Sequence, residues 1–142
     1  MGQGMRNIKN VRLKGFDYTS NGYYFVTAVG NYRQKFFLGK EDQVKDELAD
    51  LIKSIPGLGL DYFVVMPNHV HIIFILENCR LRLGEIVRRF KAKVSRRIGA
   101  AVWQPNYYEH IIRNEKALNK IREYVVNNPE EERLKFEEFY GR

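Results

Sequence analysis

Residues 60–76 read LDYFVVMPNHVHIIFIL, two apolar runs joined by Pro67 and Asn68. The first run, residues 60–66, is rich in aromatic and β-branched side chains, as strands are. The second run, residues 69–76, continues in the same way. Two strands separated by two turn-forming residues predict a tight antiparallel hairpin.

Other strands and helices are predicted on both sides of this hairpin. Residues 23–29 (YYFVTAV) and the shorter 35–38 predict strands, and residues 103–110 an aromatic, polar loop. Helices are predicted from periodicity and helix-ending signals at residues 41–55, 83–98, 115–127 and 130–139. This order predicts an α+β fold of the ferredoxin-like type, an antiparallel sheet with its helices packed on one face.

Length and charge suit a single DNA-binding domain. The 142 residues are expected to form one domain over 1–142, with a basic arm at residues 1–20. Lys and Arg number 24 against 17 Asp and Glu, a net charge of +7, which favours polyanionic partners. The single Cys excludes an internal disulfide, and no apolar run approaches the ~20 residues of a membrane span. We therefore expect a cytoplasmic protein with no membrane partner.

His69 and His71 are the first candidates for a site. They are separated by one residue of a predicted strand, so both imidazoles point to the same face of the sheet. Ile73 and Ile75 continue that face, which places the histidines at the rim of a covered apolar surface. Two neutral imidazoles can bind a divalent metal. The alternative is a pair of half-buried histidines that pack or hydrogen-bond without a metal.

A later helix could complete such a site. Tyr124 and Asn128 are four residues apart, so they share a helix face. If this face docked over the histidines, the amide could be a third ligand and the phenol would lie near the metal. The alternative is an ordinary core tyrosine and an ordinary helix end.

The stretch Met66-Pro67-Asn68-His69-Val70-His71 resembles the HUH motif (His, apolar residue, His) of the single-tyrosine transposases. Within that superfamily it most resembles the bacterial REP-associated tyrosine transposases. Three further blocks, residues 14–27, 103–114 and 123–129, resemble their first strand, pre-helix loop and tyrosine helix. The resemblance covers nearly the whole chain in the same order.

The resemblance implies a ferredoxin-like transposase that cuts and rejoins single-stranded DNA near imperfect hairpins. His69 and His71 match the metal-binding histidines. Tyr124 matches the catalytic tyrosine, which forms a 5′-phosphotyrosine link and leaves a 3′-OH, and Asn128 matches the residue that completes the metal site. The implied metal is Mg²⁺ or Mn²⁺, and imidazole ligands suit Mn²⁺ better. We expect a monomer rather than a homodimer, associated with the bacterial nucleoid.

The candidate DNA contacts are basic or aromatic. They are Arg6, Arg12 and Lys14 in the arm, Arg82, Arg88, Arg89, Lys93, Arg96 and Arg97 on or beside the helix of residues 83–98, and Tyr107, Tyr108 and Arg113. Glu85 is the one acid between Arg80 and Arg97, which favours a phosphate-binding surface over a mixed-sign solvated face. The two tyrosines could stack on unpaired bases.

Two other functions fit the same residues. One is a non-catalytic nucleic-acid-binding domain on a ferredoxin-like sheet, in which His69 and His71 are packing residues. The other is a metal-dependent hydrolase with water as its nucleophile. Neither of these would form a covalent adduct with DNA.

Overall fold

The predicted hairpin forms one side of the sheet. In the computed structural model, which describes residues 21–127, β2 (Leu58–Met66) pairs antiparallel with β3 (His69–Leu76). Pro67 and Asn68 are the two turn residues between Met66 and His69, which pair directly. The hairpin is therefore confirmed, with β2 beginning two residues before the predicted strand.

The sheet has four strands in the order β2-β3-β1-β4, and each neighbouring pair is antiparallel. The central strand β1 (Gly22–Val29) pairs with β3 and with the short edge strand β4 (Tyr108–Ile112). Helix α1 (Glu41–Ser54) connects β1 to β2, and α2 (Leu83–Ile98) connects β3 to β4. This βαββαβ order is the ferredoxin-like arrangement, as predicted.

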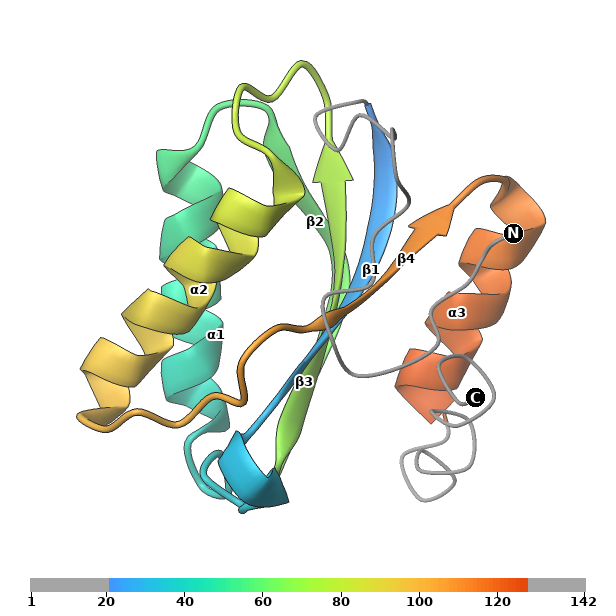
Figure 1. The fold of residues 1–142 in the computed structure, drawn as a ribbon. Helices are drawn as coiled ribbons and strands as arrows, with labels where there is room; N and C mark the ends of the chain where they lie inside the picture. Colours follow the sequence, from blue (N-terminus) through green and yellow to red (C-terminus); the bar gives the residue numbers. More distant parts are fainter. Residues whose placement is uncertain (1–20, 128–142) are drawn as a thin grey trace.

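The helices cover both faces of the sheet. Helices α1 and α2 pack together on one face, and α3 (Glu115–Asn127) lies on the other (Figure 1). The prediction that all helices share one face is right for the two helices inside the βαββαβ unit and wrong for α3. The reason lies in β1 and β3, which are apolar on both sides and so need a cover on each.

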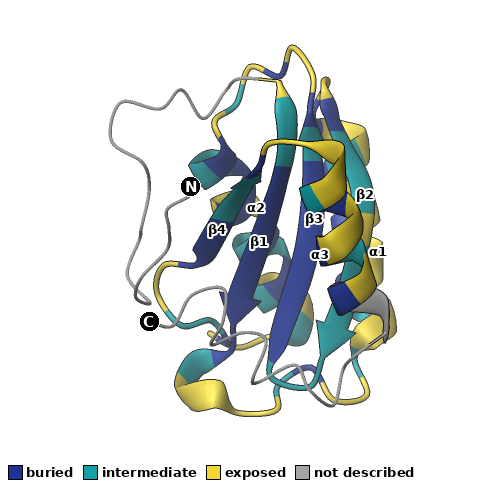
Figure 2. Cartoon of the chain, turned by 90° about the vertical axis from the view of Figure 1, so that its right-hand side faces the viewer, coloured by how far each residue is buried: buried dark blue, intermediate teal, exposed yellow. Residues whose placement is uncertain are grey.

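The second face carries its own hydrophobic cluster. Phe25 and Ile73 pack there against Leu118, Ile121 and Tyr124 of α3. Figure 2, which looks onto this face, shows β1 and β3 buried along most of their length, with α3 lying in front of β3. The spacing of the three α3 residues is that of one helix face. The packing of α3 therefore follows from a pattern that the sequence already holds.

Two segments differ from the sequence prediction. Residues 36–39 form a turn rather than a strand, because Phe37 is anchored by one backbone bond to Pro67 O (2.9 Å) and by its ring against Trp103. The loop predicted at residues 103–110 is shorter than expected, because strand β4 already begins at Tyr108. A 3₁₀ turn, η1 (Asn31–Arg33), follows β1.

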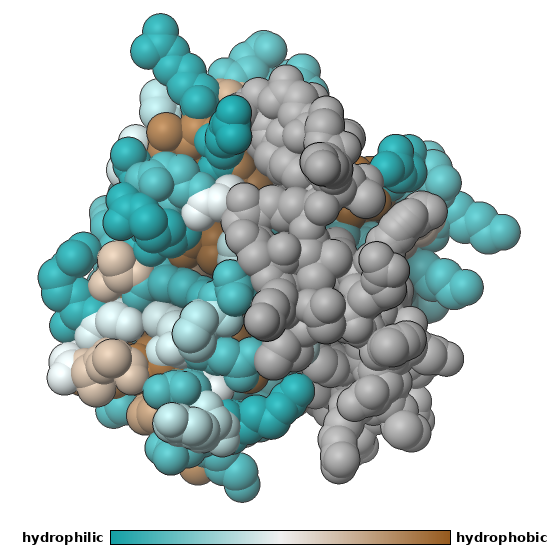
Figure 3. Space-filling model, viewed as in Figure 1, coloured by the Kyte–Doolittle hydropathy of each residue, from teal (hydrophilic) through white to brown (hydrophobic). Residues whose placement is uncertain are grey.

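The outer surface is mostly polar on the side of α1 and α2 (Figure 3). Among residues 21–127, no helix is long and apolar enough to cross a membrane. The basic arm at residues 1–20, the helix predicted at 130–139 and Asn128 lie outside the described residues.

Candidate active site

His69 and His71 lie side by side beneath α3. Both side chains project from β3 to the α3 face, and only 5% and 1% of their surfaces are exposed. Their ring centroids are 4.8 Å apart, with an edge-to-face angle of 73°. The alternation of side chains along β3 thus places two imidazoles at the distance expected of neighbouring ligands or of packed rings.

A hydrogen bond orients each imidazole through its Nδ1 atom. His69 Nδ1 lies 2.6 Å from Asn68 Oδ1, an atom that can only accept, so Nδ1 carries the proton. His71 Nδ1 lies 2.8 Å from Thr27 Oγ1, in the buried interior. With Nδ1 of His69 protonated, the lone pair of the neutral ring lies on Nε2. Metal-binding histidines are commonly held in this way by a partner on the other ring nitrogen.

Tyr124 reaches the same place from α3. Its ring centroid is 5.7 Å from that of His71, and 6% of its surface is exposed. Phe25 also contacts the His71 ring, at 5.3 Å between centroids. The structure therefore brings together three predicted side chains, His69, His71 and Tyr124, that come from a strand and from a helix far along the chain.

The donor set suits a borderline divalent metal. Two neutral imidazoles are ligands that Mn²⁺ or another first-row ion accepts. No group of three or more His, Cys, Asp or Glu side chains within residues 21–127 could hold a metal. The predicted third ligand, Asn128, lies outside the described residues. The structure thus places two of the three predicted ligands side by side, and the role of all three as metal ligands stays a prediction.

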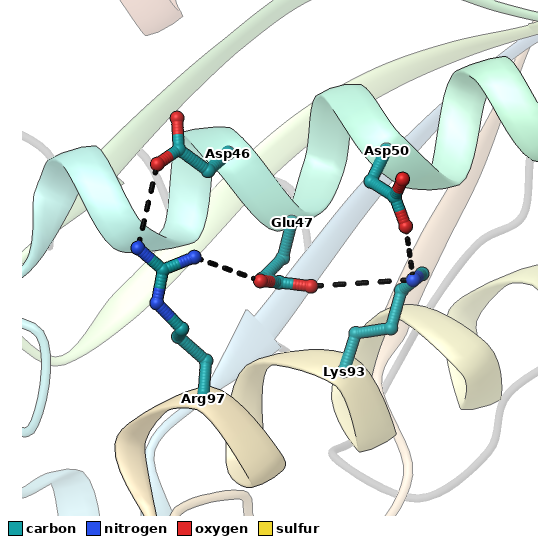
Figure 4. A network of polar contacts seen from close by, with 5 residues as sticks. All are labelled: Asp46, Glu47, Asp50, Lys93 and Arg97. Atoms are coloured by element: carbon teal, nitrogen blue, oxygen red, sulfur yellow. Dashed lines mark hydrogen bonds and ion pairs between the residues drawn. The ribbon is translucent and has the colours of Figure 1, made fainter.

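The basic side of α2 lies away from this site. Lys93 forms ion pairs with Asp50 and Glu47 of α1, and Arg97 does so with Glu47 (2.9 Å) and Asp46 (3.5 Å), as Figure 4 shows. These contacts lie on the face of the sheet opposite the histidines. The acidic partners of Lys93 and Arg97 come from α1. Counting the acidic residues along α2 alone does not reveal them.

Arg88 and Arg89 are also paired. Both donate to Glu85, which lies three residues before Arg88 and four before Arg89 on the same helix. These hydrogen bonds lower the pKa of the Glu85 carboxyl to about 2. Arg82 and Arg96 are exposed. The structure therefore does not bring the predicted DNA contacts of α2 to the histidines. Four of these contacts, Arg88, Arg89, Lys93 and Arg97, have acidic partners.

The predicted stacking tyrosines are core residues. Tyr107 is 6% exposed and packs in the cluster beneath α1 and α2, whereas Tyr108 is 3% exposed and packs in the cluster beneath α3. Neither ring presents a face to the surface, so stacking on bases is not supported for either. Their aromatic character reflects packing on the two faces of the sheet.

Arg113 is an exposed predicted DNA contact that lies beside α3. It is exposed and follows β4, where it lines a hollow of about 390 Å³ with Tyr23 and Arg122. His110, on β4, pairs in register with Phe25. Burial lowers the pKa of His110, and Arg113 adds to the effect.

Sequence reasoning missed two residues that orient the histidines. Thr27 is the one short polar side chain in the apolar run of β1, and such a residue in a buried strand is a usable signal. Asn68 was interpreted only as a turn residue, although it directly precedes His69. Thr27 contacts the Nδ1 atom of His71, and Asn68 contacts the Nδ1 atom of His69.

Comparison with known proteins now identifies the family. Residues 18–128 match the family described as "Transposase IS200 like". The chain belongs to this family. Two of its relatives are named as REP-associated tyrosine transposases, one of them as putative, and transposases are an enzyme class that acts on DNA, so the predicted class is confirmed.

Individual relatives agree with this assignment. An uncharacterised protein of Haemophilus influenzae is 37% identical, over 89% of this chain and 90% of its own length. A REP-associated tyrosine transposase of Escherichia coli K12 is 26% identical, over 79% of this chain and 68% of its own length. The predicted resemblance to the REP-associated group is thereby confirmed.

A solved structure supports the fold. A REP-associated tyrosine transposase bound to a REP hairpin superposes with a TM-score of 0.73 at 24% identity, covering 84% of this chain and 72% of that one. The α+β architecture, with its four-stranded antiparallel sheet, is therefore that of a transposase.

Proposed function

We propose that this transposase is a metal-dependent endonuclease and strand transferase that acts on single-stranded or hairpin DNA through a covalent bond to Tyr124. The observation that carries the proposal is the convergence of His69, His71 and Tyr124 under α3. The net charge of +7 and the REP hairpin bound to the structural relative support DNA as the partner. The whole chain, residues 1–142, is proposed to act as one catalytic domain.

The histidines are the proposed metal ligands. His69 and His71 would bind Mg²⁺ or Mn²⁺ through Nε2, because the Nδ1 atom of each ring already faces an oxygen. Asn128, one helical turn after Tyr124, is the proposed third ligand. The bound metal would polarise the phosphate oxygens as a Lewis acid.

Tyr124 is the proposed nucleophile. Its oxygen would attack the phosphorus, form the 5′-phosphotyrosine bond and displace the 3′ oxygen, which leaves as a 3′-OH. The net result moves the phenolic proton to the leaving oxygen, and the phosphoester energy is kept for rejoining. A phenol has a pKa of ~10, so it must lose its proton as it attacks.

The apolar surroundings favour the tyrosine over water as nucleophile. Phe25 and Ile121 belong to the cluster that encloses Tyr124. A site enclosed in this way limits the access of water, which would otherwise hydrolyse the covalent intermediate. This burial is the reason for preferring a transferase to a water-using hydrolase.

The arrangement also suits action by a single chain. Helix α3 folds back onto the strands of its own chain, so His71 and Tyr124 meet in cis. A second copy is not needed to bring the nucleophile to the histidines. We propose a monomer that acts on DNA in the cytoplasm, associated with the nucleoid.

A covalent-adduct assay tests this function. The protein is incubated with a single-stranded DNA oligonucleotide that contains an imperfect hairpin, with Mn²⁺ or Mg²⁺, and the denatured products are separated by mass. The expected result is a protein–DNA adduct that disappears in Tyr124→Phe and with a chelator. Tyr32→Phe is the matched control, because Tyr32 is 83% exposed and does not belong to the hydrophobic cluster that contains Tyr124, so its loss should leave the adduct unchanged.

Other outcomes favour the alternative functions. DNA cleavage that persists in Tyr124→Phe would mean that water is the nucleophile and that the chain is a hydrolase. Binding of the oligonucleotide without cleavage under either metal would favour a non-catalytic DNA-binding domain.

A further inference from the structure

Strand β2 is irregular at Asp61. Leu60 pairs with Phe74 and Tyr62 pairs with Ile73, so Asp61 is an extra residue without a counterpart on β3. An inserted residue of this kind is a β-bulge, which bends the strand and redirects a side chain. Here the bulged residue directs its side chain toward α3.

The Asp61 carboxylate meets Arg122 of α3 in a two-pronged ion pair. Arg122 Nε donates to Asp61 Oδ2 at 2.9 Å, and Arg122 Nη2 donates to Asp61 Oδ1 at 2.6 Å. The Asp61 side chain is 11% exposed and that of Arg122 is 39% exposed. Arg122 Nη1 also donates to Asn119 Oδ1 (3.1 Å), one turn earlier on α3. The guanidinium is thus fixed both to β2 and to its own helix.

Arg122 and Tyr124 point in different directions from the same turn of α3. Two residues along an α-helix correspond to a rotation of roughly 200° about its axis. The ion pair therefore fixes one side of this turn to β2 while Tyr124 faces His71. Apolar packing by Leu118 and Ile121 is not directional and allows small slides and rotations, whereas a two-pronged ion pair has one geometry.

We propose that the Asp61–Arg122 ion pair is a positioning device that fixes the rotation and register of α3, and so aligns Tyr124 with the two histidines. The proposal rests on the proposed function, since it assumes that Tyr124 is the nucleophile. Alignment matters because a displacement of ~1 Å can slow a reaction by about 100-fold. Neither residue touches the DNA in this role, so the effect falls on the rate of the covalent step and not on DNA affinity.

The test is a double-mutant cycle on the covalent step in the full-length protein. Asp61→Asn, Arg122→Gln and the double variant are compared with wild type for the single-turnover rate of adduct formation with saturating hairpin oligonucleotide and Mn²⁺. The dissociation constant for the oligonucleotide and the Tm are measured for each variant. Rates are compared well below the lowest Tm, so that unfolding does not contribute.

Each single variant is expected to form adduct about 10- to 100-fold more slowly, with a dissociation constant within about two-fold of wild type. The double variant is expected to be no slower than the worse single variant, because both changes remove the same contact. Glu47→Gln is the matched control: Glu47 is 19% exposed and also holds an Arg, but it lies on α1, so its rate should equal that of wild type.

Three results would overturn the proposal. They are wild-type rates in Asp61→Asn and Arg122→Gln, rate losses that only follow weaker DNA binding, and an equal loss in Glu47→Gln. A wild-type protein that forms no adduct would overturn the proposed function and this inference with it. Adduct formation by wild type together with full activity in the variants would overturn the positioning role alone.

Discussion

Thr27 Oγ1 lies 2.8 Å from His71 Nδ1, and the two residues are direct partners in the β1–β3 register. Both side chains are buried, at 0% and 1% exposure. The neighbouring strand therefore holds the His71 ring at a fixed angle, and the Nε2 atom of that ring is the proposed metal-binding nitrogen. This contact makes Thr27 a supporting residue for the proposed metal site.

Thr27→Val removes the hydroxyl and keeps the shape of the side chain. We expect Mn²⁺ affinity to fall by about 10- to 100-fold, because partners that orient metal-binding histidines have effects of that size. Titration of the protein with Mn²⁺, followed by electron paramagnetic resonance, measures the change. Ser54→Ala is the control, since the Ser54 hydroxyl bonds Leu51 O at the end of α1 and should not affect the metal. Equal affinities in Thr27→Val and wild type would mean that His71 needs no support from β1.

Asn68 offers a test of the His69 tautomer. Its Oδ1 accepts the hydrogen bond from His69 Nδ1 at 2.6 Å. Asn68→Ala should weaken Mn²⁺ binding, whereas Asn68→Asp should retain it, because a carboxylate accepts the same hydrogen bond. The same Mn²⁺ titration compares the two variants. Equal loss in both would show that the amide nitrogen of Asn68, and not its oxygen, is the important group.

The parts of the fold that sequence could predict are those with a local pattern. Period-two alternation placed His69 and His71 on one face, and the 3.6-residue period gave α2 and α3 the bounds that the structure shows. The short strand β4 carries Glu109 and His110 in its centre, so it has no alternating pattern. Its hydrogen bonds to β1 decide its conformation, and those are contacts between distant segments.

The parts of the site that sequence could not predict depend on docking. To predict that α3 covers the histidine face, one must first recognise that the sheet has a second apolar face. The continuous apolar character of β1 and β3 is the signal for that second face. That Lys93 and Arg97 would be paired required the position of α1, because their acids are more than 40 residues away along the chain. Charge along one helix does not reveal the charge of its neighbour.

His110 makes folding stability depend on pH. Burial keeps its folded-state pKa below the unfolded value of ~6.5, so the unfolded chain binds the proton more readily. Stability is therefore fully present above about pH 7 and falls as the pH drops through the unfolded pKa towards the folded one. Urea denaturation near pH 7.5 and near pH 5.5 should show a larger loss on acidification for wild type than for His110→Gln. Equal losses would mean that His110 titrates alike in the two states; His69 and His71 are present in both proteins and cancel.

The paired cations of α2 and the exposed Arg113 should differ in how they bind DNA. A phosphate contact to single-stranded DNA contributes about 0.7 to the slope of log affinity against log salt concentration. Lys93 is held by Asp50 and Glu47, so Lys93→Met should leave that slope unchanged. Arg113 is exposed on the α3 side, so Arg113→Ala should reduce the slope by about 0.7.

Fluorescence anisotropy with a labelled hairpin oligonucleotide over a series of NaCl concentrations measures both slopes. Both substitutions remove one positive charge, so a general effect of net charge would change the two slopes equally. A reduced slope for Lys93→Met and an unchanged one for Arg113→Ala would place the DNA on the α1–α2 side, away from Tyr124. The DNA path would then have to cross the edge of the sheet to reach the nucleophile, and the proposed site would need a different approach for its substrate.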